Sequence, residues 1–275
     1  MSELANSRSS QLPYLAHTLK SRPQPRVAWL GFCAGIAFVI SLLAWPTIRH
    51  FAPALANPED QWLQTILLAL PDTGFRVLMA VVVATIIAFV LAIITSSGAP
   101  DWLFRRINWF YTLIAAFPLL AWVYVMLAAP TIGFLKGHEA TTAAALAVIF
   151  PLTVPFTTTL RSASNHAIIR HARQFGAGRY WRTRLALRVA APSMLNALRV
   201  ASLGAWSVVL FAESQVTMRT DQGIGGILLL WSRTGATDFS RVVIACLAVC
   251  VAAVLIAETM TAAETIILHN NGPDY

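Results

Sequence analysis

Charged residues are scarce in this sequence. They make up 12% of its 275 residues, whereas hydrophobic residues make up 57%, and the mean hydropathy is +0.65. A soluble globular domain carries about 25% charged residues, so this composition excludes that class. The sequence predicts an all-α fold, a polytopic membrane helical bundle.

The sequence also lacks the residues of several catalytic classes. Its three cysteines, Cys33, Cys246 and Cys250, all fall in apolar runs, which predicts buried thiols rather than disulfides, and their spacing predicts no metal site. The six histidines are scattered along the chain, unlike the clustered polar groups of a membrane enzyme. No Gly-x-x-x-x-Gly-Lys-Ser/Thr phosphate loop occurs, so any ATP hydrolysis would belong to a separate polypeptide, and this chain is not expected to be an enzyme.

Long apolar runs set the expected topology. At about 20 residues per crossing they predict about six transmembrane helices: 27–49, 74–96, 108–129, 140–160, 194–216 and 241–263. A cytoplasmic tail is expected over 1–26, a transmembrane domain over 27–263 and a cytoplasmic tail over 264–275. Lys and Arg concentrate on the side of the termini, as the positive-inside rule requires, although the last tail lacks both. This bias explains the net charge of +8 without a nucleic-acid partner.

One polar segment, 161–192, interrupts the apolar runs of the second half. It contains no acidic residue and seven arginines: Arg161, Arg170, Arg173, Arg179, Arg182, Arg184 and Arg188. Such a segment is expected in the cytoplasm. A helix is predicted over 165–175, a left-handed stop at Gly176, and a second helix over 180–190 that ends near Pro192. Phe175, Tyr180 and Trp181 would anchor this finger in a groove of a soluble partner. The alternative is a basic hairpin lying on anionic lipid headgroups.

Two short apolar stretches lie between the expected spans on the outer side. In 50–72 the stretch QWLQTILLAL is too short to cross and predicts an interfacial helix. In 217–240 the glycines Gly223, Gly225 and Gly226 predict a tight turn before a re-entrant or interfacial helix. No strand precedes these glycines and no Lys-Ser/Thr follows them, which excludes a phosphate-binding loop.

The arginine-rich segment and the span after it resemble a known family. The stretches ARQFGAG and ALRVASLGAWSVVLFAES are similar to the cytoplasmic coupling loop and following helix of permeases of binding-protein-dependent ABC importers, of the nitrate, sulfonate and taurine type. The matching loop positions are Ala172, Arg173, Gly176, Ala177, Leu187 and Pro192, and the match continues through Arg199, Ala205, Trp206, Ala212 and Glu213. Weaker similarity in FRVLMA, FPLLAW and IFPLTVPFTT extends the resemblance over roughly residues 60–263.

The loop departs from the family pattern at three positions. Arg170 and His171 stand where the family has Glu and Ala, and Arg188 stands where it has its first Pro. Because the acidic contact is replaced by positive charge, the resemblance implies either an unusually acidic ATPase groove or pairing with a second, more typical permease.

The resemblance implies a set of partners. Two permease subunits, as a homodimer or a heterodimer, would enclose the path in a bacterial inner membrane. ABC ATPase subunits would bind the coupling loops and carry ATP and Mg, so this chain would hold no cofactor. An extracytoplasmic binding protein would deliver a small anion such as a sulfonate, nitrate or related organic acid.

Residues at membrane depth are candidates for the translocation path. Arg76 and Glu213 are equally consistent with a structural ion pair or interfacial snorkelling and with a pathway role. Arg199 fits the positive-inside rule, and Glu258 is expected to have a buried Ser or Thr partner. Pro118, together with Pro151 and Pro155, would permit helix bending. Trp122 and Trp206 complete the set by resemblance.

Two other classes remain open from the sequence. An ion-coupled secondary transporter would carry inverted repeats with broken helices and midplane charges, and no convincing repeat is found. An integral-membrane enzyme would require a polar cluster at one membrane surface.

Overall fold

The computed structural model describes residues 32–33, 35–42, 44, 61–96, 100–128, 139–215, 223–234 and 239–270. Every element in these ranges is a helix, in agreement with the expected all-α class. The described residues between 32 and 44 are helical, and the tail 1–26 lies outside the described part. The later helices are α3 (Gln61–Ser96), α4 (Asp101–Ala115), α5 (Ala121–Ala128), α6 (Glu139–Ser164), α7 (Ala167–Gln174), α8 (Arg179–Gln215), α9 (Ile224–Thr234) and α10 (Phe239–Asn270).

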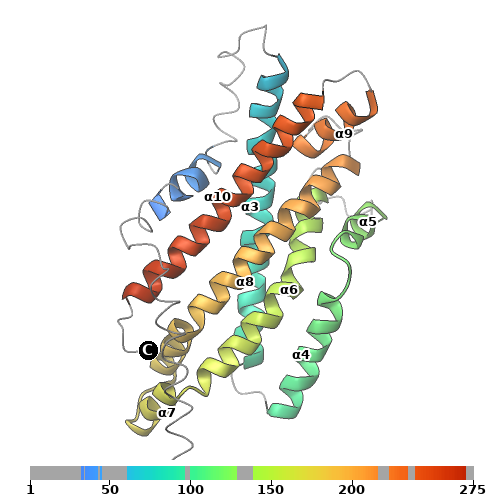
Figure 1. The fold of residues 1–275 in the computed structure, drawn as a ribbon. Coiled ribbons are helices and arrows are strands. Elements are labelled where there is room, and N and C mark those ends of the chain that lie inside the picture. The colour runs from blue at the N-terminus through green and yellow to red at the C-terminus, as the bar shows by residue number, and fades with distance from the viewer. Residues whose placement is uncertain are drawn as a thin grey trace, which may run out of the picture.

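Four of these helices are long and apolar enough to cross a membrane. The candidate spans are Thr65–Thr95, Ala140–Ser164, Tyr180–Gln215 and Arg241–Ile266, in α3, α6, α8 and α10. They cover most of the spans expected at 74–96, 140–160, 194–216 and 241–263. The four helices run side by side, with α9 at one end of the bundle and α7 at the other (Figure 1). A membrane location is indicated by these spans.

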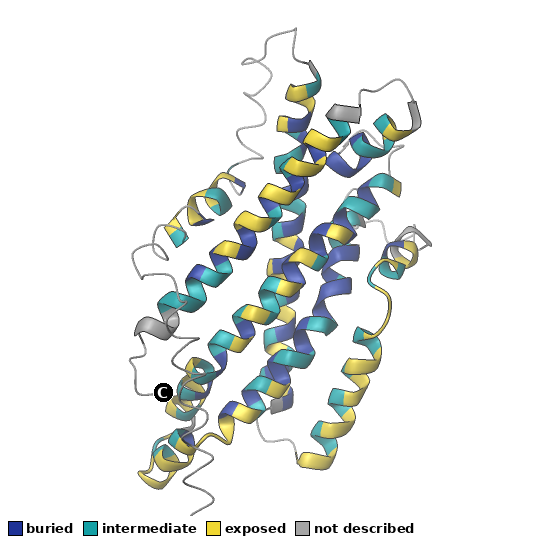
Figure 2. Ribbon diagram, viewed as in Figure 1, coloured by how far each residue is buried: buried dark blue, intermediate teal, exposed yellow. Residues whose placement is uncertain are grey.

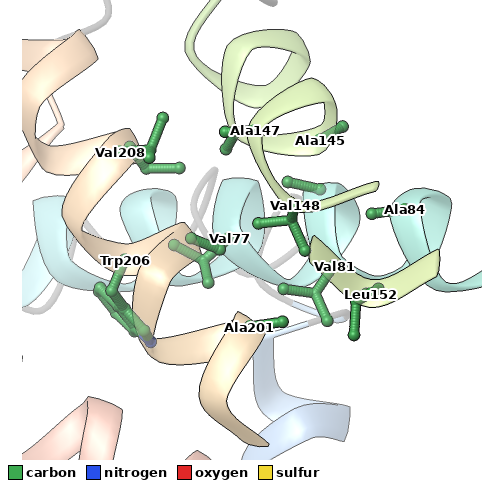
Figure 3. Packing of buried hydrophobic residues seen from close by; sticks show 14 of the residues in the cluster. Val77, Val81, Ala84, Ala145, Ala147, Val148, Leu152, Ala201, Trp206 and Val208 are labelled. Atoms are coloured by element: carbon green, nitrogen blue, oxygen red, sulfur yellow. The ribbon is translucent and has the colours of Figure 1, made fainter. Parts of the chain in front are cut away.

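Small residues bring α3, α6 and α8 close together. Ala80, Ala84, Ala88 and Ala92 recur every fourth residue of α3 and are fully buried. Side chains of α6 and α8, including those of Val148, Leu152, Trp206 and Val208, fill the centre of the bundle (Figure 3). Close approach of small residues is the usual basis of helix association in lipid.

Larger apolar side chains point out of the bundle. Val82, Ile86, Val90 and Ile94 on α3 are exposed, and exposed residues follow the outer faces of α3 and α10 (Figure 2). This arrangement of small residues inside and branched residues outside suits a hydrocarbon surrounding.

The first expected outer helix is part of a longer one. QWLQTILLAL does not form a separate interfacial helix, because α3 runs without a break from Gln61 to Ser96 with Pro71 inside it. A proline removes one backbone hydrogen bond but does not force an end when the flanking turns are held. Ile66 and Ala69 before Pro71, and Thr73 and Val77 after it, are buried and hold the helix on both sides.

The expected span 108–129 is not one helix. The backbone leaves the helical path after α4 and returns at α5, which has only eight residues. Pro118 lies in the break and cannot donate the hydrogen bond that would continue the helix.

The second half of the arginine-rich segment also differs from expectation. The helix that begins after Gly178 does not end near Pro192 but continues as α8 to Gln215. Ala186, Ala190 and Met194 form a buried stripe at four-residue spacing that crosses the proline and keeps both sides in register. At the other end of the chain, α10 continues past the expected boundary at 263 to Asn270.

Two predictions about the burial of side chains are wrong. Cys33, Cys246 and Cys250 are exposed rather than buried. Among the described residues no buried hydroxyl partners Glu258: its side chain is 61% exposed and its Oε1 lies 3.8 Å from Nη2 of Arg199. Periodicity places these residues in apolar helices, but it does not say which face of each helix meets a neighbour.

Candidate functional site

An ion pair between Arg76 and Glu213 joins two of the long helices near the α9 end of the bundle. Nη1 of Arg76, on α3, lies 2.7 Å from Oε1 of Glu213, on α8. Glu213 is 5% exposed, so its charge is compensated almost wholly by protein groups. The structure shows the ion pair, and a role of these residues in the translocation path stays a prediction.

Thr73 and the first turn of α9 complete the surroundings of this carboxylate. The hydroxyl of Thr73, one turn before Arg76, lies 3.0 Å and 2.9 Å from the two oxygens of Glu213 and donates to the carboxylate. The backbone N–H of Gly225 donates to Oε2 of Glu213 over 3.1 Å. The N–H of Ile224 donates to Oγ1 of Thr73 over 3.0 Å. Glu213 and Thr73 thus satisfy donors at the start of α9, where the helix dipole favours a negative charge.

The glycines before and within α9 allow this close approach. A Cβ added to Gly223 would collide with the carboxylate of Glu213, and one added to Gly225 would collide with the backbone oxygen of Leu210. The expected tight glycine segment therefore exists, and its role is close packing of a short helix on α8. We call Thr73, Arg76, Glu213 and the N–H groups of Ile224 and Gly225 the α9 clamp.

The other three residues predicted for the translocation path, Trp206, Pro118 and Trp122, do not belong to the α9 clamp. Trp206 lies on α8 two turns before Glu213, is 3% exposed, and has a buried indole N–H with no hydrogen-bond partner in the described part of the chain. Pro118 lies in the break between α4 and α5, and Trp122 lies in the first turn of α5, where its ring meets that of Phe117 edge-on at 5.3 Å. The structure therefore joins Arg76 and Glu213 directly, whereas no hydrogen bond, ion pair or ring contact joins Pro118 or Trp122 to this pair among the described residues. A link between these parts is the contact between the rings of Tyr124 on α5 and Phe211 on α8, at 5.8 Å.

Sequence reasoning missed Thr73 and the α9 backbone as partners of Glu213. The available indications were the one-turn spacing of Thr73 and Arg76 and the glycines that follow Glu213. Neither indication identifies the helix to which the carboxylate turns, because the contact joins residues 137 positions apart.

The opposite end of the bundle carries a helical finger made of α7 and the first turns of α8. The helix α7 ends at Gln174, and Gly176 follows the C-cap Phe175 with a φ of +76°, the left-handed conformation that favours glycine. The N–H of Ala177 donates to the carbonyl of Ala172 over 2.9 Å, and that of Gly176 donates to the carbonyl of Arg173 over 3.1 Å. These two bonds form a Schellman motif, so the expected left-handed stop at Gly176 is present.

The tip of the finger presents aromatic side chains beside cations. Phe175 is 89% exposed and Tyr180 is 72% exposed. The rings of Tyr180 and Trp181 contact edge-on at 5.9 Å, and the guanidinium of Arg184 lies 5.3 Å from the Trp181 ring. Such exposed rings on a short rigid element are typical of a docking surface.

The remaining predicted residues divide between the outside and the base of the finger. Exposed side chains on its outside are those of Arg170, His171, Arg173 and Arg188, whereas Ala172, Ala177, Leu187 and Pro192 are half-buried. Ile169 is 6% exposed and fixes α7 against the bundle. The surface has a positive charge because no acidic residue occurs between 161 and 192.

A comparison of the chain with models of known protein families gives no match, and a search of curated proteins gives none.

Proposed function

We propose that this chain is the transmembrane permease subunit of an ATP-driven ABC importer in a bacterial inner membrane. The observation that carries the proposal is the finger: two helical arms joined at a left-handed glycine, with Phe175, Tyr180 and Trp181 exposed at the end of a bundle of candidate membrane spans. Its sequence resembles the coupling loop of that family. The expected partners are ABC ATPase subunits that carry ATP and Mg, a second permease copy or a related permease, and an extracytoplasmic binding protein.

The charge of the finger specifies its proposed ATPase partner. Arg170 and Arg173 lie on the exposed side of α7, and Arg184 and Arg188 on the exposed side of α8. A groove that receives these cations without like-charge repulsion has to carry carboxylates. An acidic groove is therefore the partner surface that fits this finger.

The proposed substrate is a small anion such as a sulfonate, nitrate or related organic acid. Arg76 is its proposed contact in the path, and Glu213 already neutralises that guanidinium at 2.7 Å. An anion would have to compete with Glu213 for Arg76, which couples substrate contact to the α9 clamp. The binding protein would supply most of the selectivity.

Co-purification with the products of neighbouring genes tests the proposal. A tagged chain is expressed with its adjacent open reading frames, and retention of an ATPase subunit is measured after solubilisation. Wild-type chain is expected to retain the ATPase, and Gly176→Trp is expected to lose both the ATPase and ATP-dependent uptake. Gly178→Trp is a matched control, because a Cβ at either position meets no atom within 4 Å and Gly178 does not have the positive φ of Gly176.

Two results would contradict the importer. One is a chain that never retains an ATPase and whose Gly176→Trp variant still transports. The other is uptake driven by a proton gradient without ATP, which would favour an ion-coupled secondary transporter.

A further inference from the structure

The helix α4 has two faces with different surroundings. One face packs against α6: the carboxylate of Asp101 pairs with Arg161, whose guanidinium also lies 4.9 Å from the ring of Phe104. Further along this face, Thr157 donates to Oδ1 of Asn108 over 3.1 Å. The face continues to Tyr111, whose ring contacts that of Phe150 at 6.1 Å. These contacts hold α4 along the end of α6 that carries Arg161.

The opposite face of α4 is exposed and combines cations with aromatic rings. Trp102 and Trp109 are 59% and 67% exposed and lie at helical spacing with the exposed Arg105 and Arg106. The guanidinium of Arg106 lies 5.8 Å from the Trp102 ring. Within the described ranges no ion pair joins Arg105 or Arg106 to a carboxylate. Nε of Arg105 donates to the backbone carbonyl of Asp101 over 3.4 Å, and the carboxylate of Asp101 pairs with Arg161.

The exposed face changes character along the helix. Its first turns carry the two arginines, while its later turns carry the exposed, wholly apolar Phe110 and Leu113. Since α6 is a candidate span over Ala140–Ser164, the start of α4 lies beside the charged end of that span. Along the helix, Arg105 and Arg106 lie between Trp102 and Trp109, and Phe110 and Leu113 follow. Cations and tryptophans at one end and hydrocarbon side chains at the other match the polar interface and the acyl region of one leaflet.

We propose that this face of α4 binds an anionic phospholipid. Arg105 and Arg106 receive the phosphate, Trp102 and Trp109 lie at the level of the headgroup, and Phe110 and Leu113 contact an acyl chain. The charge favours an anionic over a zwitterionic lipid because two cations without carboxylate partners face that surface. This site is independent of any transport function, since none of its residues belongs to the α9 clamp or the finger.

Native mass spectrometry of the detergent-purified full chain tests this proposal, with phosphatidylglycerol and phosphatidylcholine as probes. Wild-type protein is expected to retain phosphatidylglycerol preferentially. Arg105→Gln together with Arg106→Gln is expected to weaken that binding about thirtyfold, from the contribution of each basic residue near an anionic surface. The Lys variants at both positions keep the charge and are expected to keep the preference. Arg170→Gln together with Arg173→Gln removes two cations from α7 and is expected to leave the preference unchanged.

Three outcomes would overturn the site. The first is equal phosphatidylglycerol binding by the wild type and the double Gln variant. The second is loss of binding only in the α7 variant, which would assign the lipid to the finger. The third is a disulfide between two chains carrying Trp109→Cys, with the three native cysteines replaced by alanine, because this would place a second copy on the face. Elution of each variant as a monodisperse species, with unchanged helical circular dichroism, shows that the chain is folded.

Discussion

Arg76 and Glu213 are 137 residues apart in sequence and 2.7 Å apart in space. Their ion pair connects the last turn of α8 to the first half of α3, and the same carboxylate also accepts a hydrogen bond from the N–H of Gly225. One buried charge thereby links three helices, and a movement of α9 away from the bundle would leave Glu213 with fewer donors.

The first prediction concerns the stability of this pair. Glu213→Gln removes the negative charge that faces Arg76, and the loss of one charge of a buried pair reduces the free energy of unfolding by about 3 kcal/mol. Thermal unfolding of the detergent-purified chain measures the loss. Glu258→Gln is the matched control: its side chain is 61% exposed, and an exposed pair contributes at most about 1 kcal/mol.

A double variant separates charge loss from packing loss. Arg76→Met combined with Glu213→Leu replaces the pair by apolar groups of similar size and is expected to recover part of the stability lost in Glu213→Gln. Equal destabilisation by Glu213→Gln and Glu258→Gln would contradict the clamp.

The second prediction concerns the glycines of α9. Gly225→Ala forces a Cβ against the backbone oxygen of Leu210, which cannot move aside without shifting α8. We expect α9 to detach from the clamp and its amides to exchange hydrogen much faster, by at least about tenfold. Hydrogen exchange read by mass spectrometry of α9 peptides measures this change.

Two further glycine variants are expected to rank with Gly225→Ala in the rate of hydrogen exchange in α9. Gly204→Ala is the control, because its Cβ would lie 3.6 Å from a Leu119 side-chain carbon, an ordinary contact. Gly223→Ala is expected to lie between the two, since its Cβ meets the side chain of Glu213 rather than backbone. Unchanged exchange in Gly225→Ala would show that α9 is not held by the clamp.

The sequence predicts the helical class and the positions of the long apolar helices because hydrophobic runs are local. It also predicts the stop at Gly176, where the backbone conformation of one residue determines the turn. The continuity of α3 through Pro71 and of α8 through Pro192 is not predictable in the same way, since a proline ends or bends a helix according to the packing on both sides. Buried Ala186, Ala190 and Met194 supply that packing in α8.

The candidate site shows the same limit. Arg76 and Glu213 are recognisable in the sequence as ionisable residues in apolar surroundings. Their mutual contact, and the role of Thr73 and Gly225 in it, depend on how α3, α8 and α9 meet. Glu258 is an equally conspicuous residue in the sequence, yet it faces outward. Which face of a helix meets a neighbour is set by tertiary packing and not by the local pattern.

The third prediction concerns the turn of the finger. Gly176→Ala places a side chain at a φ of +76°, which costs about 1 kcal/mol for an L-residue. The Schellman bonds are expected to loosen, so amides at the end of α7 exchange faster and ATPase retention falls. Gly176→Asn is expected to restore part of the protection, because Asn tolerates this conformation. If the amides at the end of α7 exchange hydrogen equally fast in Gly176→Ala and in Gly178→Ala, the expected backbone strain at position 176 is contradicted.

The fourth prediction concerns the continuity of α8 across Pro192. Arg184 and Val200 are both exposed and lie on either side of this proline. In a continuous helix their backbones are separated by about 24 Å, at about 1.5 Å per residue. Spin labels on cysteines at the two positions, with the native cysteines replaced by alanine, are expected to give one narrow distance distribution by pulsed electron paramagnetic resonance.

A second pair of labels, at Val200 and Ser207, is the control. Both residues are exposed and lie on the far side of the proline, so this pair gives the width of the distribution in an uninterrupted helix. A helix that ended at Pro192 would give a broad or shorter distribution for the first pair alone, whereas Pro192→Ala would then narrow it. Equal widths for both pairs, unchanged in Pro192→Ala, are the result expected when the buried stripe on both sides of the proline holds α8 in one piece.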